Sequence, residues 1–203
     1  MRNRKVFNQT GLPAFLFLAL CLTITPPLRA QKTANDLRKQ QVGKTGLVVY
    51  KTGEPAALPY DFGKVRFLVD SAATNGAWSL VEITEQPGYK TPMHRHNSWD
   101  ESFYVLEGTL TAKVADSVYT LPKGSYILIP RGTPHGQANL ASVPVKLLLS
   151  ITPSGFERHI KDRVELFKTV KPEHSEFATK MDSLRKKNAK YIEILGSWDA
   201  PKR

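Results

Sequence analysis

The amino-acid sequence predicts an all-β sandwich or barrel followed by a helical extension. Between residues 78 and 152, short β-rich runs follow one another closely and are separated by Gly, Pro and Asn turn signals. No helical period of useful length interrupts these runs, whereas after Ser154 apolar residues recur at helical spacing. The chain has 203 residues, 41% of them hydrophobic, which is enough for one domain with its own core.

Residues 1–30 have the layout of a secretory signal peptide. A basic start precedes the apolar run 12–25, and Ala30 offers a cleavage site before Gln31. The run is short for a membrane span, although an uncleaved N-terminal anchor is the alternative. We therefore expect an exported protein, periplasmic or extracellular, with no stable membrane span after cleavage.

Cysteine content and charge argue against several function classes. The only cysteine, Cys21, lies in the predicted signal peptide, so the mature chain would have no disulfide, thiolate ligand or cysteine nucleophile. The formal net charge of +11 is spread along the chain, and no basic helix is interleaved with aromatic residues. We therefore expect no nucleic-acid partner.

A polar N-terminal segment, residues 31–44, precedes the expected β-barrel, which we place over residues 45–153. Gly108 lies inside the longest β-rich run and predicts a turn or bulge there. The β-rich runs, in chain order, are residues 47–53, 64–70, 78–85, 102–114, 117–121, 125–130, 136–140 and 143–152.

The final segment, residues 154–203, is predicted to be a helical extension packed on the barrel. Ser154 and Glu157 have the spacing of a capping box at the start of a helix. A second helix is expected to begin near Pro172. The two apolar stripes consist of Phe156, Ile160, Val164 and Phe167, and then of Phe177, Met181 and Leu184. Such stripes usually pack against a core, so we expect no cofactor on them.

Three histidines and one glutamate in the β-rich region predict a metal site. His94 and His96 are two residues apart, so on a strand they point to the same side. Glu101 opens the next β-rich run and can return a carboxylate to the same place. His135 follows a further strand that can lie beside the first. Imidazoles and a carboxylate suit one divalent first-row metal, and Mn, Fe, Co, Ni, Cu and Zn all accept such ligands.

Two spaced patterns contain these residues. The first consists of Gly88, His94, His96, Glu101 and Gly108, and the second, after a fifteen-residue spacer, of Gly124, Pro130, Gly132, His135 and Asn139. In residue types, spacing and order, both patterns resemble the two motifs of the cupin superfamily. The resemblance implies a cupin-type double-stranded β-helix, that is, a jelly-roll barrel, with the C-terminal helices added to it.

Carried over residue by residue, the resemblance implies that the metal ligands are His94, His96, Glu101 and His135. The glycines and prolines of the two patterns, together with Asn139, are expected to form turns and barrel positions, because glycine permits positive φ and proline fixes φ. His159 and His174 lie outside the motifs on predicted helices, and we interpret them as surface or hydrogen-bonded core residues.

Strand alternation suggests further residues of a substrate pocket. Phe103 shares a face with Glu101, and Gln137 shares a face with His135, so both are candidates for contact with a substrate. Trp99 lies on the loop between the ligands and is a candidate to cover the mouth of the pocket. For the two aromatic residues, plain core packing is the alternative.

The segments Thr152–Arg158 and Lys190–Gly196 also resemble the quercetin dioxygenase-like branch of the cupins. This resemblance implies a metal-dependent dioxygenase that acts on a small enol-, phenol- or flavonol-like molecule, with Glu101 as the base for the substrate proton. The alternatives are a metal-dependent lyase, isomerase or epimerase, and a non-catalytic protein that binds a small ligand. Cupins often form dimers, so a homodimer is a further expectation.

Overall fold

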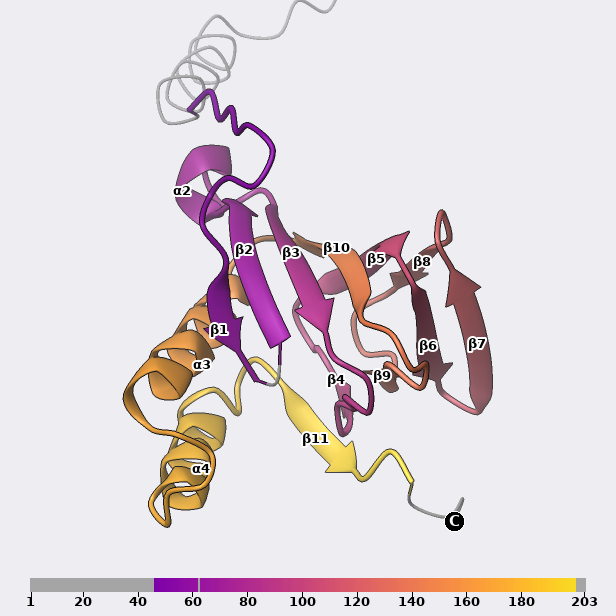
Figure 1. Ribbon diagram of the computed structural model, residues 1–203, viewed down its shortest axis with the longest axis vertical. Coiled ribbons are helices and arrows are strands. Elements are labelled where there is room, and N and C mark those ends of the chain that lie inside the picture. Colours follow the sequence, from indigo (N-terminus) through magenta and orange to yellow (C-terminus); the bar gives the residue numbers. More distant parts are fainter. Residues whose placement is uncertain (1–45, 62, 200–203) are drawn as a thin grey trace, which may run out of the picture. The chain divides into compact units, whose positions relative to one another are not determined.

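The computed structural model describes residues 46–61 and 63–199 of the chain (Figure 1). The predicted signal peptide (1–30) and N-terminal segment (31–44) lie outside these described residues. The described residues belong to one compact unit. Within them, no helix combines the length and the apolar character needed to cross a membrane.

The described chain folds into two antiparallel sheets. The six-stranded sheet contains, in spatial order, β1 (Leu58–Tyr60), β2 (Gly63–Val69), β3 (Ser79–Glu85), β10 (Val145–Thr152), β5 (Asp100–Glu107) and β8 (Tyr126–Ile129). The five-stranded sheet contains β11 (Glu193–Gly196), β4 (Met93–Arg95), β9 (His135–Ala138), β6 (Thr109–Val114) and β7 (Ser117–Pro122). The all-β prediction and the jelly-roll barrel implied by the resemblance are both confirmed.

Strict alternation of side chains builds the core of the barrel. Every second residue of β3 and of β10 is buried, and the two strands pair in register, with Val81 opposite Leu149. Because alternate residues on a strand share a face, these buried side chains point into the space between the sheets. Phe103 and Leu110, both almost fully buried, come from β5 and β6 and join the same core.

The motif glycines form turns, as the sequence predicts. Gly108 joins β5 to β6 with φ +76°, and a Cβ atom there would lie 2.7 Å from the carbonyl oxygen of Pro144. Only glycine fits this position without strain, because it needs both a left-handed backbone and a close approach of two chains. Positive φ angles are also found at Gly88, Gly124 and Gly132.

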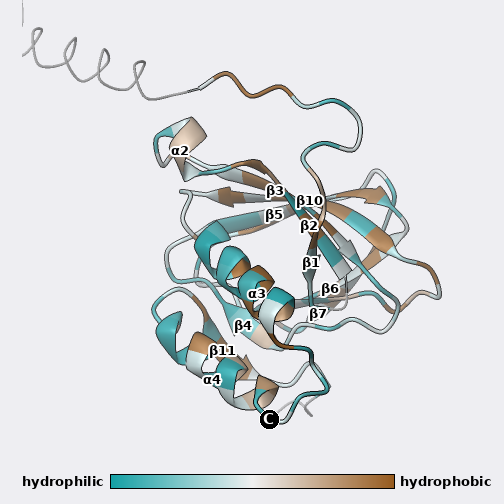
Figure 2. Cartoon of the chain, turned by 60° about the vertical axis from the view of Figure 1, so that its left-hand side comes forward, coloured by the Kyte–Doolittle hydropathy of each residue, from teal (hydrophilic) through white to brown (hydrophobic). Residues whose placement is uncertain are grey.

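Two helices follow the barrel, α3 (Glu157–Thr169) and α4 (Phe177–Lys187), and a single short turn of helix, α2 (Ser71–Thr74), connects β2 to β3. Helix α3 runs alongside β1 (Figures 1 and 2). Its residues Ile160 and Val164 enter the barrel core, while Leu166, Val170 and Met181 form a second apolar cluster between α3 and α4. The predicted stripes therefore pack on the barrel and on each other.

The predicted capping box at the start of α3 is not formed. The hydroxyl of Ser154 is buried without a hydrogen-bonding partner among the described residues, and the N-cap residue is Phe156, which has no capping side chain. The Glu157 carboxylate instead accepts hydrogen bonds from the backbone N–H groups of Gly155 and Ser71. The Glu157 side chain thus satisfies one donor near the start of the helix and one in a distant segment, and the capping box with Ser154 does not form.

The predicted helical extension also contains a strand that the sequence did not indicate, β11, which follows α4. This strand pairs antiparallel with β4, and Ile194 lies opposite His94. The ion pair of Arg95 with Glu193 joins the two strands. Strand β4 has only three residues and would otherwise form the edge of its sheet. An unpaired edge exposes backbone groups, so β11 covers the strand that carries His94.

Candidate metal centre

The four predicted ligands meet inside the barrel. One ligand atom from each of His94, His96, Glu101 and His135 lies within 4.8 Å of all the others, and the four residues are buried. Strand pairing explains this meeting: His94 on β4 lies directly opposite His135 on β9. Glu101 comes from β5 in the other sheet, so the site bridges the two sheets.

Backbone carbonyl groups orient all three imidazoles. The Nδ1 atom of His94 lies 2.9 Å from the Pro92 oxygen, that of His135 lies 2.8 Å from the Thr133 oxygen, and that of His96 lies 3.3 Å from the Tyr191 oxygen. Because a carbonyl oxygen only accepts, each Nδ1 carries the proton, and each Nε2 is left for the shared centre. This arrangement of outer partners is typical of histidines that bind metals.

The electrostatics of the cluster favour a cation. Burial alone would raise the pKa of Glu101, but the imidazoles of His96 and His135 outweigh burial and hold the pKa well below its usual range. The carboxylate is therefore ionised, and its Oε2 lies 2.8 Å from the His135 Nε2. Burial lowers the pKa of His94 to about 4, so this ring is neutral at pH 7.

One buried nitrogen shows how well the cluster fits a metal ion. The Nε2 atom of His96 has no hydrogen-bonding partner among the described residues and lies 3.7 Å from the Glu101 Oε2. An unpaired buried nitrogen and a buried negative charge both destabilise a fold unless a ligand satisfies them. A divalent first-row metal would satisfy both at once, since three imidazoles and one carboxylate form a suitable ligand set. The cluster can therefore bind such a metal.

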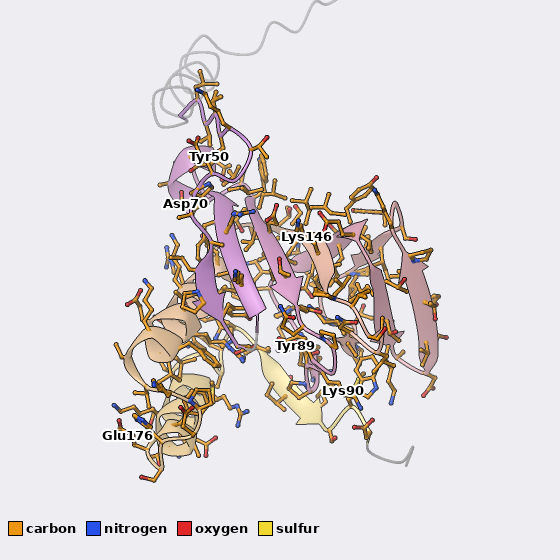
Figure 3. The ribbon with its side chains drawn as sticks, in the orientation of Figure 1. Tyr50, Asp70, Tyr89, Lys90, Lys146 and Glu176 are labelled. Atoms are coloured by element: carbon orange, nitrogen blue, oxygen red, sulfur yellow. The ribbon has the colours of Figure 1, made fainter. Side chains whose placement is uncertain are left out.

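A cavity of about 390 Å³ lies next to the cluster, and His94 and Glu101 form part of its wall. It extends between the barrel and the C-terminal extension. Much of its wall is apolar and is formed by Ile83, Leu149, Phe156, Ile160, Phe167 and Phe177. Tyr89 and Lys90 line the cavity from the loop before β4, and Figure 3 shows them next to β11. The side chains of His94 on β4 and Glu101 on β5 thus border a largely aromatic and aliphatic space.

Of the three predicted pocket residues, Gln137 lines this cavity. Trp99 and Phe103 lie elsewhere, in the hydrophobic core. The ring of Trp99 packs against Phe156, and its Nε1 atom donates to the Ser154 carbonyl oxygen. The core position of both aromatic rings corresponds to the alternative interpretation of these residues.

Gln137 also contacts a buried acid that the sequence analysis missed. Its side-chain amide donates a hydrogen bond to Glu85, which is 2% exposed and ends strand β3. Burial raises the pKa of Glu85 to about 8, despite the opposing hydrogen bond from Gln137. Glu85 is therefore mostly protonated at pH 7. Its inward position follows from the alternation of β3, which the sequence displays, but its partner comes from a distant strand.

His159 on α3 is the second residue that the sequence analysis missed. We expected a surface or hydrogen-bonded core histidine, yet His159 is 3% exposed, lines the cavity, and leaves its Nδ1 atom without a partner among the described residues. His174, by contrast, is exposed and precedes α4. The helical spacing around His159 was a signal that it belongs to the cavity wall. One face of the helix carries five residues that all line the cavity: Phe156, His159, Ile160, Arg163 and Phe167.

A partly buried ion pair closes another part of the cavity wall. The guanidinium group of Arg163 pairs with the Asp61 carboxylate, which also accepts a hydrogen bond of 3.0 Å from the Tyr89 hydroxyl. The same guanidinium lies over the ring of Tyr60, 5.5 Å from its centroid. Because α3, β1 and the loop before β4 supply these groups, the network ties the helical extension to the barrel.

Comparisons with known proteins agree with this geometry. Residues 81–151 match the family described as the cupin domain. The chain is 36% identical over 75 residues to an uncharacterized protein of Methanocaldococcus jannaschii, covering 37% of this chain and 60% of that protein. It is 28% identical over 81 residues to the tetracenomycin polyketide synthase protein TcmJ of Streptomyces glaucescens, covering 40% and 53%. It is 31% identical over 78 residues to quercetin 2,3-dioxygenase of Bacillus subtilis, covering 37% and 23%.

Among solved structures, KdgF from a Halomonas species is similar with a TM-score of 0.49 and 15% identity, covering 56% of this chain and 99% of that one. The polyketide cyclase RemF from Streptomyces resistomycificus has a TM-score of 0.47 and 24% identity, covering 54% and 81%. The chain therefore spans at most 60% of the curated relatives named above, and the matched family segment ends before α3.

Proposed function

We propose that this chain, whose residues 81–151 form a cupin domain, is a metal-dependent dioxygenase that acts on a small oxygenated aromatic molecule of the enol, phenol or flavonol type. One observation carries the proposal. The buried cluster of three histidines and one glutamate opens, through His94 and Glu101, into a cavity whose wall is rich in aromatic side chains.

The residues of the cluster would hold one divalent transition metal. When bound, such an ion polarises a coordinated oxygen and, if it is redox-active, exchanges electrons with dioxygen. A dioxygenase transfers both oxygen atoms to its substrate, so the reaction needs no external reductant. The sequence similarity to quercetin 2,3-dioxygenase of Bacillus subtilis supports this class of reaction.

The protein side chains have distinct roles in this proposal. Glu101 lines the cavity as a carboxylate, so its oxygen can accept the proton of a substrate hydroxyl. His94 lines the same wall, so a molecule in the cavity lies next to the cluster. The rings of Phe156, Phe167 and Phe177 provide flat apolar surfaces that exclude water from the bound molecule.

Oxygen uptake tests the proposal. Metal-loaded protein is expected to consume dioxygen with at least one member of a panel of flavonols and enediols, and isotopically labelled dioxygen should enter the product. Glu101→Gln removes the base and should abolish turnover. Glu107→Gln, on the same strand but with an exposed side chain, is the matched control and should retain it. Oxygen uptake by Glu101→Gln at the wild-type rate would contradict the role of Glu101.

A second candidate function is a non-oxidative proton transfer, as in a lyase, isomerase or epimerase. Its support is the neutral imidazole of His159 in the same cavity, because a site with both a carboxylate and a second nitrogen base can move a proton between two positions of a substrate. Product formation under strictly anaerobic conditions distinguishes this candidate from the dioxygenase. Metal-loaded protein that converts no panel member but is stabilised by one of them would favour a binding protein instead.

We also propose that the protein is exported, on the basis of the signal-like sequence of residues 1–30. N-terminal sequencing of the protein recovered from the envelope or medium should then begin at Gln31. Recovery of chains that begin at Met1 would contradict cleavage.

A further inference from the structure

His159 is a buried imidazole that belongs to the cavity but not to the four-residue cluster. It lies in the first turn of α3, is 3% exposed, and lines the cavity. Its Nδ1 atom is buried and has no hydrogen-bonding partner among the described residues. Burial of an unsatisfied polar atom destabilises a fold, so such an atom next to a cavity points to a ligand that satisfies it.

The neighbours of His159 do not form a hydrogen bond with its Nδ1 atom. Phe156 offers only its ring, which lies 5.3 Å from the imidazole centroid. Arg163, one turn further along α3, donates its hydrogen bonds to Asp61. The protein therefore positions an imidazole in the cavity wall without giving its Nδ1 atom a partner in the described structure.

The distance from His159 to the cluster is short enough for one small molecule to span. Both imidazoles contact the same ring: the Phe156 centroid lies 4.4 Å from that of His96 and 5.3 Å from that of His159, which limits the separation of the two imidazoles. His159 shares the cavity wall with His94 and Glu101. A planar molecule in this cavity can therefore face the cluster with one polar group and His159 with another.

We propose that His159 is a substrate-binding residue that forms a hydrogen bond with a second oxygen substituent of the substrate, away from the group that faces the cluster. This inference rests on the proposed function and narrows its substrate class to aromatic molecules that carry a hydroxyl group distant from the reacting one. Burial, with the charge of Arg163 as the next cause, lowers the pKa of His159 to about 3. The ring is therefore neutral at pH 7 and has one donor and one acceptor nitrogen, either of which a hydroxyl group can match.

The dependence of a binding ratio on His159 tests this hydrogen bond. Quercetin carries several hydroxyl groups, whereas the parent flavonol keeps the adjacent hydroxyl and ketone and lacks the others. Both are titrated anaerobically, by calorimetry, into the metal-loaded full chain. The wild-type protein should bind quercetin about fivefold more tightly than the parent flavonol, a ratio expected for one neutral hydrogen bond. The variant His159→Leu should bring the ratio close to one, and His159→Gln, which can still donate and accept, should retain part of it.

His174→Leu is the matched control, because His174 is an exposed histidine outside the cavity. It should keep the wild-type ratio. A melting experiment separates a binding role from a structural one: His159→Leu removes an unsatisfied polar atom, so its melting temperature should be equal to or higher than that of the wild type. A clear fall in melting temperature would show that His159 has a structural partner, and would overturn the inference.

Three further outcomes would overturn it: binding of neither flavonol, equal binding of both by the wild type, or an unchanged ratio in His159→Leu. Failure of the dioxygenase proposal is recognised separately, by metal content and by oxygen uptake. If oxygen uptake is absent while the binding ratio depends on His159, the dioxygenase proposal fails and the binding role stands.

Discussion

At the scale of single residues, three backbone carbonyl groups determine the chemistry of the cluster. The oxygens of Pro92, Thr133 and Tyr191 each hold the Nδ1 proton of one histidine, so the three Nε2 atoms are the nitrogens left for a metal. Two of these oxygens lie two residues before the histidine that they orient, whereas Tyr191 comes from the distant C-terminal segment.

The buried acid Glu85 gives a prediction for pH dependence. Its pKa rises from 4.5 to about 8 on folding, so between these values the folded state holds a proton that the unfolded state has lost. The contribution of Glu85 to the free energy of unfolding is therefore fully present below pH 4.5 and is lost as the pH rises towards 8. We expect Glu85→Gln, which cannot ionise, to be more stable than the wild type by a larger margin at pH 8 than at pH 5.

Urea unfolding at pH 5 and at pH 8 measures this margin, which is the difference in free energy of unfolding between the variant and the wild type. Glu173→Gln, at an exposed position, is the control and should leave the margin near zero at both. A margin for Glu85→Gln that does not change with pH would mean that Glu85 is ionised in the folded protein.

The sequence predicted the four cluster residues because their spacing is local and resembles a known pattern. His94 and His96 are two residues apart, and the motif spacing brings Glu101 and His135 into the same prediction. Glu85 and His159 could not be recognised in this way, since each owes its role to burial against distant segments. The helical spacing of His159 with Phe156 and Arg163 indicated that the three share a face. Apolar stripes usually pack into a core, however, so the sequence favoured a structural role for His159.

At the scale of elements, the turn between β5 and β6 tests why a motif position is glycine. Gly108 and Gly124 both have positive φ, but only at Gly108 would a Cβ atom meet a backbone oxygen, whereas nothing lies within 4 Å of a Cβ at Gly124. We expect Gly108→Ala to lower the free energy of unfolding by about 2–4 kcal/mol and Gly124→Ala by about 1 kcal/mol. Denaturant unfolding measures both, and equal losses would argue against the close approach at Gly108.

Strand β11 is the element that connects the C-terminal extension to the cluster. It pairs with β4, and Tyr191, just before it, provides the carbonyl oxygen that orients His96. A chain that ends at Ala189 should therefore bind a divalent metal about tenfold to a hundredfold more weakly, which is the usual effect of losing an outer partner of a metal ligand. The control Glu193→Gln removes one ion-pair partner and keeps the strand. Equal metal affinity of the shortened chain and the control would contradict this role of the extension.

The strands of the barrel could be predicted from the sequence because turn residues and alternation mark them locally. The short strand β11 was not predicted, since four residues after a lysine-rich helix give little alternation, and pairing with β4 decides their conformation. The capping box failed for a similar reason: Glu157 has the right spacing, but the N–H of Ser71, 86 residues away along the chain, uses its carboxylate. Tertiary contacts replaced local ones in both cases.

At the scale of the whole described molecule, the barrel supplies the cluster and the C-terminal extension supplies much of the cavity. The matched family segment, residues 81–151, contains all four cluster residues. The cavity wall is completed by the α3 N-cap residue Phe156, by His159 and Arg163 from α3, by Phe177 from α4 and by Ile194 from β11. We therefore expect the barrel to supply the metal ligands, one of them oriented by Tyr191 of the extension, and the choice of substrate to depend mainly on the extension.

The metal content of the purified, untagged full chain tests the central claim most directly. Elemental analysis by mass spectrometry should find one divalent transition-metal ion per chain after the protein has been supplied with metal. The same measurement on Glu101→Gln should find much less metal, and on Glu107→Gln as much as in the wild type. A wild-type chain that retains no metal, or a Glu101→Gln chain that retains all of it, would contradict the proposal that these four residues form a metal site.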